Sequence, residues 1–171
     1  RTLSVSTKAL NKSLERLSSG LRINRAADDA AGLAIAEGFR AQVRGTGVAQ
    51  RNAQDGVSLV QTAEGALSET TNILQRVREL AVQASNGTQS TQNREAINQE
   101  VLQLLEQIDD IAVDTEFNGI RVLSSAQTVT LQSGAYTSQT LVISVSGAKT
   151  SELRVSQIRV STVAGAVSAL S

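Results

Sequence analysis

The 171-residue sequence carries 16 Lys and Arg and 16 Asp and Glu residues, and this balance argues against nucleic acid as a partner, because phosphate binding needs uncompensated cations. It contains no Cys and no His, which excludes disulfides, Cys/His zinc sites, Cys nucleophiles and Ser-His-Asp triads. No apolar run approaches the roughly 18 residues that span a membrane, so no membrane partner is predicted.

The first predicted element is an amphipathic helix over residues 1–19. Leucines recur along it at steps of four and three, and Ser18-Ser19-Gly20 provides a stop. Residues 20–32 are expected to form an irregular connector. Asn24 is a candidate N-cap there, and Asp28 and Asp29 favour the positive end of the helix that follows.

The second predicted element is a helix that continues to about Ala84, which the absence of Pro permits. An apolar seam follows it with coiled-coil-like spacing, shifted once near Val57, as a stammer would shift it. Such a rod needs neighbouring helices to cover its apolar face. Twelve of the fifteen seam positions are apolar: Ala36, Phe39, Val43, Thr46, Gln50, Ala53, Val57, Val60, Ala63, Leu67, Thr70, Leu74, Val77, Ala81 and Ala84.

A turn at Asn86-Gly87 predicts a second helix antiparallel to the first. Ile97, Val101, Leu104, Ile108 and Ile111 share one of its faces. The predicted fold class is therefore mainly α, a long antiparallel helical rod over residues 33–115.

A small β-hairpin region is expected over residues 116–160. The helical period stops at Phe117-Asn118-Gly119, after which two apolar runs alternate at period two on either side of Ser133 to Gln139. These runs are Val129 and Leu131, then Leu141, Ile143 and Val145. Leu153, Val155, Ile158 and Val160 predict a further short strand, and residues 161–171 predict the first turns of another helix.

Two groups of carboxylates are candidates for catalysis or for cation binding. Asp28 and Asp29 are neighbours on a helix and diverge by about 100°, so a helix-dipole role is favoured over an acid/base pair. Asp109, Asp110, Asp114 and Glu116 lack calcium-loop spacing, so a solvated face is favoured over a cation site. The sequence thus predicts no enzyme, no cofactor and no metal.

One further stripe lies on the first long helix. Ile73, Arg76, Leu80 and Gln83 share a face at steps of three, four and three, and this face is predicted to lie beside the seam. Two interpretations remain open: a solvated flank with stray apolar residues, or an interaction surface anchored by Arg76 and the apolar side chains.

Several segments, in order along essentially the whole chain, resemble bacterial flagellins. Residues 14–35 (LERLSSGLRINRAADDAAGLAI) and 52–67 (NAQDGVSLVQTAEGAL) are similar to the amino-terminal flagellin signature. Residues 74–83 (LQRVRELAVQ) resemble a segment of the first long flagellin helix, and 115–119 (TEFNG) resemble the end of the second. Residues 160–165 (VSTVAG) resemble the approach to the carboxy-terminal helix.

The resemblance implies a structural subunit of the bacterial flagellar filament, outside the cell, that assembles with other flagellin subunits and is handled by flagellar export and assembly factors. Residues 1–19 would belong to the terminal coiled coil, 20–32 to a connector, 33–115 to the rod helices, and 161–171 to the start of the carboxy-terminal rod helix. Because flagellins extend further at both ends, the resemblance also implies truncation at both ends.

In flagellins, positions on this helical face also take part in recognition by Toll-like receptor five of animal hosts. The receptor-contacting Arg, Leu and Glu correspond to Arg76, Leu80 and Glu100, flanked by Ile73 and Gln83. The seam residues expected to support assembly are Phe39, Val43, Val57, Val60, Leu67, Leu74 and Val77. Two alternatives remain: a hook–filament junction protein of the same extended family, and an intracellular coiled-coil adaptor.

Overall fold

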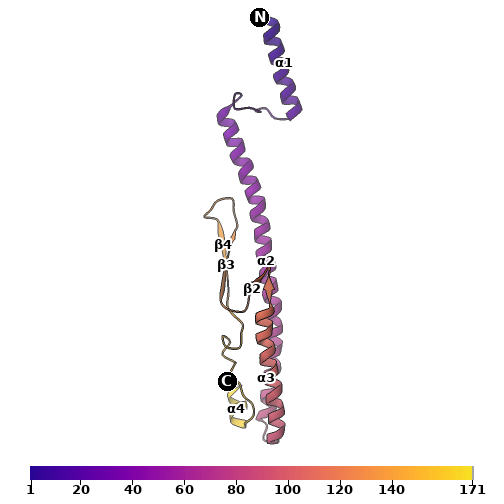
Figure 1. Ribbon diagram of the computed structural model, residues 1–171, viewed down its shortest axis with the longest axis vertical. Coiled ribbons are helices and arrows are strands. Elements are labelled where there is room, and N and C mark those ends of the chain that lie inside the picture. The colour runs from indigo at the N-terminus through magenta and orange to yellow at the C-terminus, as the bar shows by residue number, and fades with distance from the viewer. Residues whose placement is uncertain (171) are drawn as a thin grey trace. The chain divides into compact units, whose positions relative to one another are not determined.

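A computed structural model describes residues 1–170 and confirms the mainly α fold class, with long helices and two small antiparallel strand pairs (Figure 1). The chain divides into a first unit, residues 1–51 with 132–139, and a second unit, residues 52–131 with 140–171. The elements are α1 (Thr2–Ser19), α2 (Ala30–Ser85), α3 (Thr91–Asp114), β1 (Glu116–Phe117), β2 (Ile120–Arg121), β3 (Gln127–Gln132), β4 (Thr140–Val145) and α4 (Val163–Ser168).

Helix α1 ends where it is predicted to end. Gly20 adopts a left-handed conformation with φ of 70°, and its N–H donates to the carbonyl of Arg16. Within the first unit α1 buries none of its residues, so its leucine face is open to solvent.

The connector between α1 and α2 is fixed by polar contacts to α1. The Lys12 ammonium lies 2.5 Å from the Asp28 carboxylate, and Arg25 donates to Glu15 over 2.8 Å. The expectation that Asn24 caps α2 is wrong, because its side-chain amide instead donates to groups of α1. The N-cap is Asp29, whose Oδ1 accepts the Gly32 N–H over 2.9 Å.

The second unit holds the main core, where α3 packs on the second half of α2 (Figure 1). Residues 86–90 form the predicted turn. Ser90 caps α3 by accepting the Asn93 N–H over 3.1 Å. Arg94 stabilises the turn, because its guanidinium donates to the carbonyls of Ala84 and Asn86. The two helices are therefore antiparallel partners, as predicted.

After α3 the chain forms two strand pairs. Strands β1 and β2 join in a tight turn at Asn118 and Gly119, which both have positive φ, and Phe117 pairs with Ile120. The predicted hairpin is β3 with β4, confirming the alternation of apolar residues in this part of the sequence.

The further strand expected between Leu153 and Val160 is absent, since residues 151–160 form turns and irregular backbone. Here side chains of α3 replace strand hydrogen bonds. The Asp109 carboxylate accepts the N–H and the hydroxyl of Thr150, each over 2.8 Å, and the Asn98 amide oxygen accepts the buried Val160 N–H over 3.0 Å. The helix predicted from residue 161 onward is present as α4, and Ser171 lies outside the described residues.

Most hydroxyl groups of helix α2 donate to backbone carbonyls of the same helix. Five of its Ser and Thr side chains donate to the carbonyl four residues earlier, over 2.8–3.1 Å. They are Thr46, Ser58, Thr62, Thr70 and Thr71.

Candidate functional site

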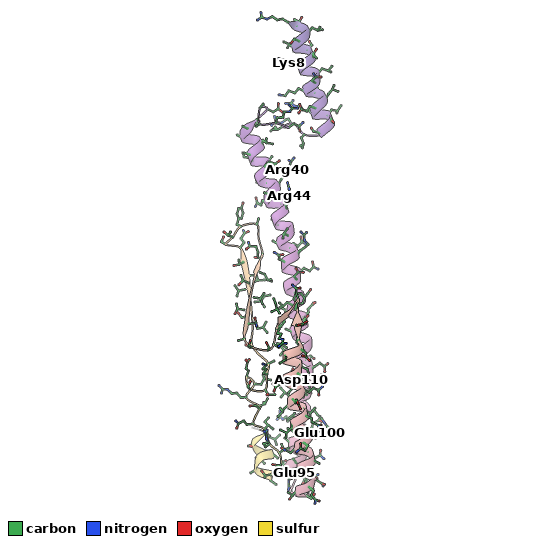
Figure 2. The ribbon with its side chains drawn as sticks, in the orientation of Figure 1. Lys8, Arg40, Arg44, Glu95, Glu100 and Asp110 are labelled. Atoms are coloured by element: carbon green, nitrogen blue, oxygen red, sulfur yellow. The ribbon has the colours of Figure 1, made fainter. Side chains whose placement is uncertain are left out.

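A charged cluster joins α2 to α3 in the second unit. The Arg76 guanidinium reaches Glu100 over 2.9 Å through Nη2 and contacts Glu79, one turn further along α2, over 3.2 Å through Nη1. The side chains of Arg76 and Glu100 are 51% and 46% exposed, so the pair remains accessible from solvent. Figure 2 shows Glu100 on α3. The structure therefore brings together two of the three residues that the sequence assigned to receptor contact.

Both carboxylates stabilise the charged form of Arg76. The hydrogen bonds that Arg76 donates to Glu100 raise the pKa of Arg76 above its ordinary value, and the hydrogen bond that it donates to Glu79 adds to this effect. Because an arginine is already protonated at every physiological pH, the raised pKa changes no charge. The two hydrogen bonds instead fix the geometry of the side chain. Glu79 on α2 and Glu100 on α3 hold the Arg76 guanidinium at the surface where the two helices meet.

The expected position of Leu80 and Ile73 beside the core is wrong. Leu80 is 1% exposed, and Ile73 is also buried, and both belong to the core between α2 and α3. Only Arg76 and Gln83 of the four-residue stripe are exposed. Leu80 consequently cannot present an accessible apolar anchor in this fold, and its contribution to any surface is to position the helix beneath Arg76.

The buried stripe of α2 coincides with half of the predicted seam. Its steps alternate between four and three, which is a heptad pattern visible in the sequence itself. Four positions agree, and the other four seam residues, Val60, Leu67, Leu74 and Ala81, each lie one residue C-terminal to the stripe residue. The buried or half-buried stripe consists of Leu59, Ala63, Ala66, Thr70, Ile73, Val77, Leu80 and Ala84.

The seam residues expected to support assembly have different surroundings. Val77 is buried and Leu74 is half-buried against the core of the second unit. Phe39 and Val43 in the first unit are 63% and 71% exposed. The remaining three lie in the second unit and are also exposed: Val57, Val60 and Leu67.

The hairpin packs on α2 where the helix has no side chain. A Cβ added at Gly56 would collide with Leu131 of β3 and contact Ile143 of β4. Beyond this point Val57 and Val60 line an open apolar groove with Leu141 and Ile143. Beside the contact of β3 and β4 with α2 at Gly56, an apolar strip of these two valines therefore stays exposed.

These surfaces are exposed and apolar or charged, as contact surfaces for other helices or proteins are. Among residues 1–170, no group of three or more carboxylates is placed to hold a metal ion. In the same residues, no helix combines the length and the apolar character that a membrane span requires. Exposed apolar strips on long helices are typical of surfaces that bind other proteins.

Known proteins share both the sequence and the fold. A sequence model described as the bacterial flagellin N-terminal helical region matches residues 1–128. Flagellins of Salmonella muenchen and Salmonella typhimurium are each 52% identical over 141 residues, which cover 82% of this chain and 28% of the relative. The crystal structure of Bacillus cereus flagellin shares 30% identity, with a TM-score of 0.58 and 71% of each chain covered. The structure of FliC from Burkholderia pseudomallei shares 39% identity, with a TM-score of 0.51 over 57% of this chain and 38% of that chain.

The chain therefore belongs to the bacterial flagellin family. It spans about 28% of the length of the Salmonella relatives it matches. As a member of the family it is a component of the bacterial flagellum, outside the cell, which removes the basis for an intracellular coiled-coil adaptor.

Proposed function

We propose that the chain is a structural subunit of the flagellar filament and assembles with further copies through repeated contacts between unlike surfaces. Contacts of that kind build an open helix when the rotation from one copy to the next does not close a ring. The observation that carries the proposal is the exposed apolar face of α1 and of the first half of α2, in a protein of the flagellin family. Its exposed members are Leu3, Leu10, Leu14, Leu17, Phe39 and Val43.

The division of the chain follows from this role. We assign residues 1–19 to the inner coiled coil of the filament, 20–32 to the connector, and 33–115 to the rod helices. Residues 116–160 form the β-hairpin region of the rod, and 161–171 begin its carboxy-terminal helix. The ion pairs from Lys12 and Arg25 support the connector assignment, because they fix the connector to α1. Flagellar export and assembly factors are the proposed partners before polymerisation.

The test is complementation in a bacterium that lacks its own flagellin, using the chain with its native flanking sequence. Filaments on the cells and restored swimming are expected from the parent. Replacing Phe39 and Val43 together by Asn removes exposed apolar surface without disturbing a described core contact, so filaments should be lost while the monomer stays folded. The matched control is Gln42→Asn on the same helix. Normal filaments from the double variant, or none from the parent, would contradict the proposal.

We also propose that the unassembled chain is a ligand of Toll-like receptor five. The observation that favours this second function is the half-exposed pair of Arg76 and Glu100, joined over 2.9 Å, which presents a cation and an anion side by side. Interfaces concentrate their binding energy in a few such residues, often about 2 kcal/mol each, which corresponds to roughly thirtyfold in affinity.

A binding titration with the receptor ectodomain tests the second function. Arg76→Ala should weaken binding at least about tenfold, and Glu100→Ala by a similar or smaller factor. Gln42→Ala, an exposed change elsewhere on α2, is the control and should have little effect. Leu80→Ala should act only by destabilising the helices, because its side chain is buried. Parental affinity in both Arg76→Ala and Glu100→Ala would show that the pair is not the contact.

A further inference from the structure

The net charge of the chain is zero, but its two units carry opposite net charges. The first unit contains nine Lys and Arg against four Asp and Glu, a net charge of +5, and the second contains seven against twelve, a net charge of −5. Figure 2 labels representatives of each: Lys8, Arg40 and Arg44 on α1 and α2, and Glu95, Glu100 and Asp110 on α3. A charge separation of this size creates a field that acts on whatever approaches the molecule.

The negative charge is concentrated on the outer face of α3. This helix carries six carboxylates and one cation, Arg94, whose guanidinium is already bonded to backbone carbonyls of the turn. Four exposed carboxylates fall within about 100° of one another, on the side opposite the buried face of the helix. Exposed Gln99 and Gln103 lie between them. The acidic stripe consists of Glu95, Glu106, Asp110 and Asp114.

The positive charge of α2 lies on one side of its first half. Arg40, Arg44 and Arg51 are exposed, and steps of four and seven residues place them within about 40° of one another. They form the basic stripe. Arg40 shares one ion pair with Glu37 over 2.6 Å, whereas Arg44 and Arg51 have no carboxylate within salt-bridge distance among residues 1–170. Guanidinium groups without a partner retain all their donors for another molecule.

We propose that the basic stripe of one copy binds the acidic stripe of a second copy. This inference rests on the proposed self-assembly and names the surfaces that direct it. Because each copy carries one stripe of each kind, the contact joins unlike surfaces and leaves both partners with a free stripe, so further copies can be added.

The spacing of the two stripes is compatible with direct pairing. Arg40 and Arg44 are one helical turn apart, about 6 Å of rise, and so are Glu106 and Asp110. In an antiparallel alignment Arg40 faces Asp110 and Arg44 faces Glu106. Arg51, seven residues after Arg44, then faces Gln99, whose amide oxygen is an uncharged acceptor seven residues before Glu106. No like charges are opposed over these three positions. The next charged residue of α2 on this side, Asp55, would face Glu95, so the pairing is confined to the segment from Arg40 to Arg51.

The stripes direct assembly and contribute little to holding it together. Exposed ion pairs are individually weak, but complementary charge raises the rate of encounter by orders of magnitude and suppresses wrong orientations. Salt screens this effect, since the Debye length is about 8 Å at physiological ionic strength. Apolar burial along the exposed strips supplies the remaining attraction.

Charge reversal with complementation tests the proposal on the chain with its native flanking sequence. The first variant is Arg40→Glu with Arg44→Glu, which places carboxylates opposite Asp110 and Glu106 in this register. The second is Glu106→Lys with Asp110→Lys, which places ammonium groups opposite Arg44 and Arg40. Each alone should polymerise at least about tenfold more slowly than the parent at low salt, measured by light scattering and electron microscopy. An equimolar mixture should recover parental rates, and so should the variant that carries all four changes. Arg78→Glu with Arg121→Glu changes the charge equally elsewhere and should behave as the parent does.

The outcomes separate the two proposals. Circular dichroism first establishes that each monomer is folded. If the parent polymerises and either reversal alone does so at the parental rate, the stripes are not the contact. If both reversals fail and neither the mixture nor the fourfold variant recovers, each stripe meets some other surface, and the inference is again overturned. A parent that never polymerises would instead refute the proposed function.

Discussion

The two units of the chain contain comparable apolar patterns but very different cores. In the first unit, Ala49 is the only buried residue among 1–51 and 132–139. In the second unit, α3, the hairpin and the segment around α4 cover α2, and two cores of buried residues form. Helix α2 runs through both units as one element. The difference shows that periodicity predicts which face of a helix is apolar, whereas the neighbours decide whether that face is buried.

The largest expected effect contrasts Leu80 with Phe39, both apolar residues of α2. Leu80→Ala removes a side chain that is fully packed in the second unit, and we expect the free energy of unfolding to fall by about 2–5 kcal/mol. Phe39→Ala in the first unit should change it by no more than about 0.5 kcal/mol, because the ring contacts mainly solvent. Urea unfolding followed by far-ultraviolet circular dichroism measures both. Equal effects would remove the contrast between the units.

A smaller effect is expected from the hydrogen bond that holds the irregular segment 151–160 against α3. Asn98→Ala removes the acceptor of the buried Val160 N–H, and an unpaired buried donor costs about 1–3 kcal/mol. Its exposed neighbour on the same helix provides the control, since Gln99→Ala should be nearly neutral. Hydrogen exchange should show the Val160 amide losing its protection only in Asn98→Ala. Retained protection would mean that another group accepts this bond.

Glycines of α2 sharpen the comparison further. An Ala side chain at Gly47 in the first unit meets nothing within 4 Å, so Gly47→Ala should stabilise the helix by about 0.5–1 kcal/mol. At Gly56 in the second unit the same methyl group collides with Leu131, and overpacking of about 1–3 kcal/mol outweighs the helical gain. The two changes should therefore shift the thermal midpoint in opposite directions. If both variants raise the thermal midpoint, Leu131 and the hairpin move aside without loss of stability, and the prediction is wrong.

The smallest expected effect is a pH dependence confined to the first unit. The hydrogen bond from Lys12 lowers the pKa of Asp28 below its ordinary value of 3.8, with bonds from the Asn24 and Arg25 backbone amides adding to it. A lowered folded pKa stabilises the connector above about pH 4, and this contribution is lost as the pH falls through the folded value. Nuclear magnetic resonance shifts of residues 24–28 should then change below pH 4.

The control for that titration is Asp28→Asn, which removes the carboxylate and should abolish the change. A shift that persists in Asp28→Asn would assign it to another group.

The sequence was sufficient for the long elements and insufficient for their exact faces. The absence of proline, the Asn86-Gly87 turn and the alternation around Val129 and Ile143 predicted α2, α3 and the hairpin, because local backbone preferences dominate there. The error at Leu80 arose where two candidate stripes differ by one residue, or about 100° of rotation, and the packing of α3 chooses between them.

Other features differ in how much local signal the sequence holds for them. The segment from Leu153 to Val160 alternates imperfectly. Asp109 and Asn98, from a helix about 40–60 residues earlier, bind Thr150 just before this segment and Val160 at its end. The pair of Arg76 with Glu100 could be anticipated from the antiparallel turn, whereas the second acceptor, Glu79, follows from simple i+3 spacing on the same helix.

The inward-bonded hydroxyls of α2 have a consequence for hydration. Thr46 is exposed and Thr70 is buried, yet the hydroxyl of each donates to a carbonyl of its own helix. These side chains therefore need no water as a hydrogen-bond acceptor, and they present methyl groups to their surroundings. An apolar surface that covers Thr46 can therefore displace the water around this side chain without leaving its hydroxyl donor unpaired. At these hydroxyl positions, helix α2 can be dehydrated in its exposed part as readily as in its covered part.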